Sequence, residues 1–152
     1  MPANFNPIYA LTPNVGSVKI TTTAALVRSD GSAVSAIGTD QFLAFSSGTN
    51  GSFIQRVRFQ PVASAAAVSS VATTLRVFLS SVNSGTPTAT NTNLLAEIAV
   101  PIISTANSIN ATNYYEIPLN IAIPASRYIL VAQHVAQTTN QSWQAIVFGG
   151  DY

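Results

Sequence analysis

Two stretches in the middle of the chain, SFIQRVRFQPV at 52–62 and TTLRVFLS at 73–80, decide the fold class. In both, side chains alternate with a period of two, as in a β-strand whose two faces differ. One face of each strand is apolar and carries Phe53, Val57 and Phe59 in the first and Leu75, Val77 and Leu79 in the second. The opposite faces carry Ile54, Arg56 and Arg58 in the first strand and Arg76 and Phe78 in the second. Alignment of the apolar faces predicts that the three arginines project from the same side of one sheet.

The rest of the chain also consists of short strand-like segments and turns. Strand-like segments, separated by Gly-, Pro-, Ser- and Asn-rich turns, recur at 15–27, 41–45, 94–100, 114–119, 127–135 and 142–148. Asn50-Gly51 predicts a hairpin between 41–45 and 52–62. Pro118 predicts either that its strand lies at a sheet edge or that the proline lies near the end of the strand. About eight strands without a helix predict an all-β protein, an antiparallel β-sandwich or a barrel. Eight strands in two sheets is the number of a jelly roll, which is the sandwich we expect, although the alternation of side chains alone does not distinguish it from other sandwich topologies.

The chain has 152 residues, the size of one domain. We expect an extended N-terminal arm over 1–14, where Pro2, Pro7 and Pro13 exclude a helix, and a single sandwich domain over 15–152. The arm carries apolar side chains that can dock on this chain or on a neighbour: Phe5, Ile8, Tyr9 and Leu11. The first residues lack the pattern of a signal peptide, so we expect synthesis in a cytoplasm and no membrane partner.

Charge is unusually scarce. Charged residues make up 7% of the chain, against about 25% in ordinary soluble domains, and the formal net charge is +1. This charge is too small to attract nucleic acid electrostatically. A surface with so few charges lacks the usual protection against association, which favours a protein that is covered by neighbours in an assembly.

No motif indicates an enzyme, a cofactor or a metal site. The chain has no cysteine and a single histidine, His134, for which a hydrogen-bonded or interface role near a strand end is expected. Glu97 and Glu116 are the carboxylates within predicted strands. A glycosidase would need such a pair facing each other across a cleft, but ion pairs with the arginines are the favoured role.

Aromatic residues offer one binding hypothesis. Tyr114, Tyr115 and Trp143 could stack on a sugar ring, since the chain is rich in Asn, Gln and Thr hydrogen-bond partners. Against this, Trp143 alternates in register with Ala145 and Val147, which favours a place in the core.

The arginine face offers the other hypothesis. Three like charges on neighbouring strands repel one another, and Ile54 and Phe78 on the same face disfavour exposure to water. A neighbour or the arm could cover the face and supply carboxylates. We therefore expect an assembly interface, formed by the arginines, Phe78 and the arm: Arg56, Arg58, Arg76, Phe78, Phe5, Ile8 and Tyr9.

Several segments resemble small virion proteins of tailed phages. They are GTNGSFIQRVRFQPV at 48–62, TLRVFL at 74–79, LLAEI at 94–98, IPLN at 117–120 with Pro124, and WQAIVFGGDY at 143–152. The resemblance implies a β-sandwich or jelly-roll decoration (cement) protein, often a homotrimer, on the capsid exterior of the virion, with the major capsid protein shell as its partner. Tail and head-fibre proteins share this style, so a carbohydrate-binding module for receptor attachment is the alternative.

Overall fold

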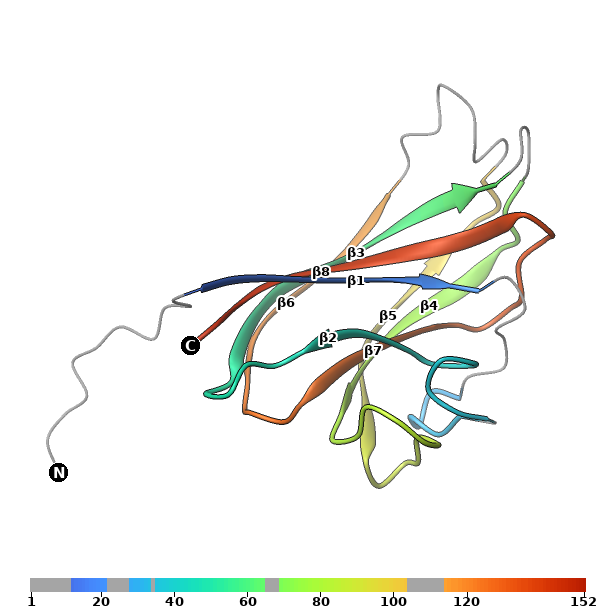
Figure 1. Ribbon diagram of the computed structural model, residues 1–152. Coiled ribbons are helices and arrows are strands. Elements are labelled where there is room, and N and C mark those ends of the chain that lie inside the picture. The colour runs from blue at the N-terminus through green and yellow to red at the C-terminus, as the bar shows by residue number, and fades with distance from the viewer. Residues whose placement is uncertain (1–11, 22–27, 34, 65–68, 104–113) are drawn as a thin grey trace, which may run out of the picture.

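The computed structural model describes residues 12–21, 28–33, 35–64, 69–103 and 114–152 (Figure 1). These ranges form eight strands and no helix. The strands are β1 (Thr12–Ile20), β2 (Phe42–Ser46), β3 (Ser52–Ala63), β4 (Thr73–Ser80), β5 (Thr92–Val100), β6 (Tyr115–Ile123), β7 (Tyr128–Gln133) and β8 (Gln141–Asp151). Within these ranges no helix is long and apolar enough to cross a membrane.

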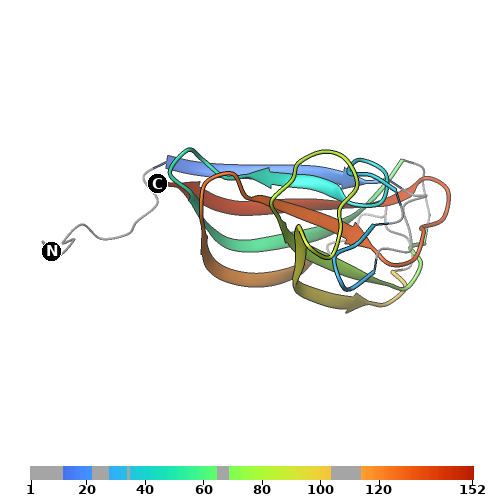
Figure 2. The same ribbon diagram turned by 90° about the horizontal axis from the view of Figure 1, so that it is seen from below.

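The strands form two four-stranded antiparallel sheets, ordered β1-β8-β3-β6 and β2-β7-β4-β5. Figure 2 shows β1, β8, β3 and β6 side by side in that order. The first strand pairs with the last, and the pairing continues toward the middle of the chain: β1 with β8, β2 with β7, β3 with β6 and β4 with β5. This is the pairing of one long hairpin that is rolled into a sandwich. This is the jelly roll that the sequence predicts.

The main core lies between the two sheets. Its largest fully buried members include Trp143 and Phe59 from one sheet and Leu75 and Ile129 from the other. A second, smaller cluster lies on the outer face of the β2-β7-β4-β5 sheet, where Phe78, Leu130 and Ala132 are buried under Ile37, Leu43, Leu94 and Tyr128. Because β7 is buried on both faces, its sequence reads as a continuous apolar run.

A β-bulge interrupts the alternation of β3. The register against both neighbouring strands shifts between Ile54 and Arg56, so Gln55 is an extra residue relative to β8. Ile54 is therefore fully buried with Val57 and Phe59, whereas Phe53 is only half-buried. The prediction that Phe53 belongs to the core face and Ile54 to the arginine face is wrong, because a strict period of two cannot represent the bulge.

Two further predictions change. Asn50-Gly51 forms a turn, with Gly51 at a φ of 93°, but β2 and β3 belong to different sheets, so the predicted hairpin is wrong. The turn instead carries the chain from one sheet to the other.

Thr12, Pro13 and Asn14, which are expected in the arm, begin β1, while residues 1–11 lie outside the described ranges. The edge position predicted from Pro118 is confirmed, since β6 ends its sheet.

Candidate functional site

The three arginines do not share one sheet. Arg56 and Arg58 lie on β3 in the β1-β8-β3-β6 sheet, whereas Arg76 lies on β4 in the opposite layer. All three point away from the core between the sheets, so they occupy opposite outer faces of the sandwich. The alternation of a strand shows which of its faces is apolar, but not to which sheet the strand belongs. The prediction of one common arginine face is therefore wrong.

Arg76 is engaged within its own chain. It is 9% exposed; its Nε donates to Oε2 of Glu97 at 2.9 Å, and its Nη1 lies 3.0 Å from Nδ1 of His134. Phe78 beside it is fully buried in the second cluster. Neither side chain is available to a partner on this surface, contrary to the expected interface. The hydrogen-bonded role expected for His134 is confirmed.

Arg56 and Arg58 share one carboxylate. Oε1 of Glu116 accepts from Nε of Arg56 at 3.2 Å and lies 2.7 Å from Nη2 of Arg58. The register explains the arrangement, because Glu116 on β6 is directly opposite Arg58. The ion pairs expected for Glu97 and Glu116 are confirmed. They also remove one argument for an interface, since this chain itself supplies the carboxylates that a neighbour was expected to provide.

The two guanidinium groups lie over aromatic rings. The guanidinium carbon of Arg56 lies 4.3 Å from the centroid of the Phe148 ring, and Phe148 is directly opposite Arg56 on β8. The guanidinium carbon of Arg58 lies 4.4 Å from the centroid of Tyr114 and 5.4 Å from that of Phe148. We call these five residues, Arg56, Arg58, Tyr114, Glu116 and Phe148, the arginine–aromatic cluster.

Electrostatics stabilise the ionised state of the cluster. The hydrogen bond from Arg58, and the positive charges of Arg58 and Arg56, hold the pKa of Glu116 below its usual value against a smaller opposing effect of burial. Glu116 is thus ionised at neutral pH. With two guanidinium groups and one carboxylate, the cluster carries one uncompensated positive charge.

A hollow of about 290 Å³ lies beside the cluster, with Val15, Phe53 and Phe148 on its rim. Gly149 and Gly150 of β8 also line it, and Gly150 lies between Phe53 on β3 and Pro13 on β1. Val15 is 59% exposed. The hollow therefore offers apolar walls next to a positive charge.

The three aromatic residues expected to bind glycan do not form a platform. Trp143 is fully buried, and Tyr115 packs edge-to-face against it with the ring centroids 6.0 Å apart. Tyr114 alone is exposed, at 53%, and its ring stacks on Arg58. The expectation that Trp143 belongs to the core is confirmed, and the three rings do not offer the shared exposed surface on which a sugar could stack.

Two further points concern the residues of the predicted arm and the search for a metal site. Phe5, Ile8 and Tyr9 lie outside the described residues, so their part in an interface stays a prediction. The described residues contain no group of three or more His, Cys, Asp or Glu side chains that could hold a metal ion.

Sequence patterns alone do not predict three residues of this surface: Val15, Phe53 and Phe148. A strict alternation places Phe53 in the core, because it does not include the bulge at Gln55. The available signal was the pair Gly149-Gly150 at the end of an apolar strand, since glycine within a strand often marks a bulge or a close backbone approach.

No family model and no curated protein matches this chain. Solved chains with some likeness include one from the structure of infectious bursal disease virus Gt strain, with a TM-score of 0.32 and 13% identity over 99% of this chain and 36% of that one. Another is from the crystal structure of the infectious bursal disease virus VP2 subviral particle, with a TM-score of 0.31 and 12% identity over 99% and 37% of the two chains. The chain thus spans little more than a third of their length. These likenesses are too weak to assign a function.

Proposed function

We propose that this chain is a structural virion protein, a decoration protein that binds the outside of an assembled tailed-phage head and stabilises it. The observation that carries the proposal is the arginine–aromatic cluster with its adjoining hollow on the outer face of the β1-β8-β3-β6 sheet. Here Val15 and Tyr114 are more than half exposed, although both are large and partly or wholly apolar. Exposed apolar groups around fixed charges are typical of an interaction surface.

The chemistry of the cluster suits a protein partner. Arginine and aromatic side chains contribute most of the binding free energy at many protein interfaces, above all where they are held in place before binding. Glu116, Phe148 and Tyr114 hold the two guanidinium groups in this way. The uncompensated charge favours a partner that presents a carboxylate, and the hollow has room for an apolar side chain beside it.

The low fraction of charged residues also supports the proposal. With 7% charged residues, the chain lacks the charges that keep free proteins apart, and a place in an assembly would cover part of this surface. The resemblance of five segments to virion proteins of tailed phages favours the same role. The jelly roll serves capsid proteins and lectins alike, so the fold does not choose between them.

The proposed mechanism is mass action. A protein that binds the closed shell, and not its separate subunits, stabilises the shell by its binding free energy. In this proposal the major capsid protein is the partner, and the chain acts as a homotrimer on the exterior of the virion. We also propose that Phe5, Ile8 and Tyr9 contribute contacts to a neighbouring copy or to the shell.

Imaging of particles assembled with and without this chain tests the proposed location. Density spread evenly over the head, lost when the chain is absent, is the expected result. Density at a single vertex or on the tail would overturn the decoration role and favour a tail or fibre module instead.

A further inference from the structure

Arg127 differs from the arginines described above. It lies just before β7, is half-buried, and its guanidinium group has no carboxylate or other hydrogen-bond partner among the described residues. Keeping a cation partly out of water without a counter-charge costs free energy. Such a group is therefore a candidate for binding an anion.

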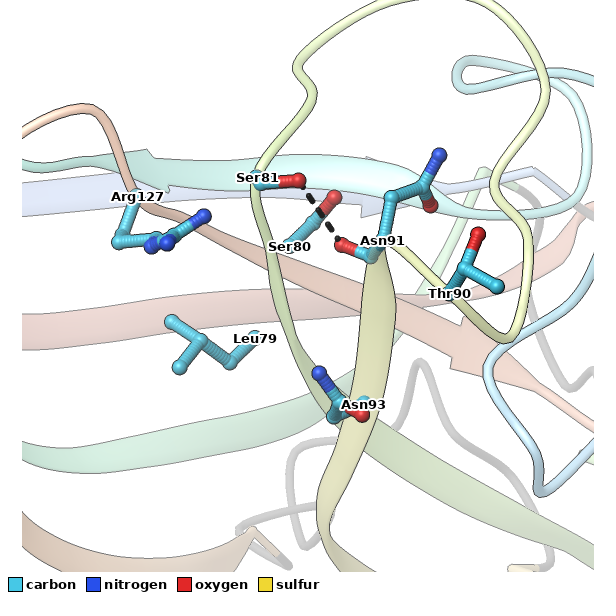
Figure 3. Close-up of a pocket in the computed structure, with 7 residues that line it drawn as sticks. All are labelled: Leu79, Ser80, Ser81, Thr90, Asn91, Asn93 and Arg127. Atoms are coloured by element: carbon cyan, nitrogen blue, oxygen red, sulfur yellow. Dashed lines mark hydrogen bonds between the residues drawn. The ribbon is translucent and has the colours of Figure 1, made fainter.

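Arg127 borders a cavity of about 210 Å³ at the end of the β2-β7-β4-β5 sheet. Figure 3 shows its side chain on one side of the cavity and Asn91 and Asn93 on the other, with the end of β4 between them. The register produces this arrangement, because Ser80 on β4 pairs with Tyr128 on one side and with Thr92 on the other. Leu79, which packs against the main core, supplies an apolar wall.

The polar groups opposite Arg127 are partly fixed. Oδ1 of Asn91 accepts from the amide of Thr88 and from Oγ1 of Thr92, both at 2.9 Å, which leaves its NH₂ group to donate. Oγ of Ser81 donates to the carbonyl of Asn91 at 3.3 Å and can still accept (Figure 3). The Asn93 side chain has no hydrogen-bond partner among the described residues and is exposed. The cavity thus offers one cation and several neutral donors and acceptors.

We propose that this cavity binds a sugar acid, a monosaccharide unit that carries a carboxylate, with the carboxylate on Arg127 and the ring hydroxyls on Asn91, Asn93 and Ser81. A planar guanidinium group matches a carboxylate in a bidentate pair. The neutral lining matches hydroxyl groups, and a single cation suits a singly charged ligand better than a phosphate dianion. The volume is below the roughly 300 Å³ of pockets for drug-sized ligands, so it has room for one ring unit.

This site is separate from the arginine–aromatic cluster, which lies on the other sheet. Binding of a sugar acid here therefore neither requires nor excludes the decoration role. It would give the protein a glycan-binding activity at residues different from Tyr114, Tyr115 and Trp143.

The test is a titration of the ¹⁵N-labelled full chain with D-glucuronate, followed by amide chemical shifts. D-glucose is the control for the sugar ring without the carboxylate, and acetate is the control for the carboxylate without the ring. We expect saturable shifts centred on Ser81, Asn93 and Arg127 with glucuronate, and at least tenfold weaker binding of each control. Equal binding of glucose or acetate, or no shifts at these residues with glucuronate, would overturn the proposal.

Variants locate the binding. Arg127→Gln should weaken glucuronate binding at least tenfold, and Asn93→Asp, which places a carboxylate across the cavity, should do the same. Arg127→Gln should fold, because the hydrogen bonds that fix this position come from the backbone: the Arg127 amide donates to Oγ of Ser47 and its carbonyl accepts from the Ser47 amide, both at 3.0 Å. Lys19→Gln, which removes an exposed cation on β1, is the matched control and should leave binding unchanged. Unchanged binding in both folded cavity variants would refute the assignment.

Discussion

Arg58 and Glu116 lie directly opposite each other on neighbouring strands, with Nη2 of Arg58 2.7 Å from Oε1 of Glu116. The same oxygen accepts from Nε of Arg56, two residues along the strand. One carboxylate thus holds together two like charges that would otherwise repel. This relationship fixes the positive groups of the proposed interaction surface, and its loss should be measurable in the free protein.

Glu116→Gln should lower the melting temperature by less than about 4 °C, because exposed ion pairs contribute little to stability. The effect should depend on pH. The arginines hold the folded-state pKa of Glu116 below its ordinary value of 4.5, so the stabilisation is complete above that value and is lost as pH falls through the folded-state pKa. Thermal unfolding of both proteins between pH 7 and pH 2 checks this. A difference that stays constant over that range would contradict the ion-pair account.

Asp151→Asn should destabilise the protein by about 1 kcal/mol. Its carboxylate accepts from Oγ of Ser52 at 2.5 Å and from Nδ2 of Asn14 at 3.0 Å, so it connects the end of β8 to β3 and β1. Burial acts to raise its pKa, but the hydrogen bonds from Ser52, Asn14 and the Gly48 amide outweigh burial and lower it.

The control for Asp151 is Asp30→Asn. The pKa of Asp30 is also lowered, by hydrogen bonds from Ser32, but these bonds are local to one exposed turn. Urea unfolding should therefore show a smaller loss for Asp30→Asn than for Asp151→Asn. An equal or larger loss at Asp30 would show that the contacts between strands contribute nothing extra.

Gly16→Ala should destabilise the protein by about 1–3 kcal/mol, the usual cost of overpacking. A Cβ atom at this position would lie 1.9 Å from the carbonyl oxygen of Ala44, where β1 passes over β2 of the other sheet. Ser17→Ala, at the neighbouring exposed position, is the control and should have little effect. A Gly16→Ala variant as stable as the Ser17→Ala variant would show that the two strands are not so close.

Trp143 is the sole tryptophan, so intrinsic fluorescence reports on it alone. Because it is fully buried, its emission should be blue-shifted and insensitive to iodide, and glucuronate should not quench it. Trp143→Ala should cost about 3–5 kcal/mol, as expected for a large core side chain. Strong iodide quenching in the folded protein would contradict the core position and revive the glycan role.

Much of the fold follows from sequence patterns, because strands, turns and apolar faces are local properties. Strands β3 and β4 lie where the alternation of side chains at 52–62 and 73–80 predicts them. The pairing of strands is not local, so Asn50-Gly51 indicated a turn correctly but could not show that the chain changes sheet there. In the same way, the bulge at Gln55 exchanges Phe53 and Ile54 between faces without any signal that the alternation of side chains could reveal.

The candidate site was predictable only in part. The sequence predicts Glu116 as a partner for the arginines, because carboxylates are so scarce in this chain, and the structure pairs it with Arg58. Phe148 was not, since its position opposite Arg56 depends on which strands are neighbours. Tertiary structure likewise determines that Arg127 has no partner among the described residues and that Arg76 pairs with Glu97.

The proposed decoration role is tested most directly by binding to phage heads that were assembled in the absence of this chain. Co-sedimentation would compare the wild-type protein with Arg58→Ala and Val15→Ser, which alter the cluster and the rim of its hollow, and with Val135→Ser as the matched control. Val135 is 39% exposed and follows β7, away from the proposed surface. We predict at least tenfold weaker binding for the first two variants and unchanged binding for the third. Wild-type affinity in folded Arg58→Ala and Val15→Ser proteins, or no binding of the wild-type protein to the shell, would contradict the account.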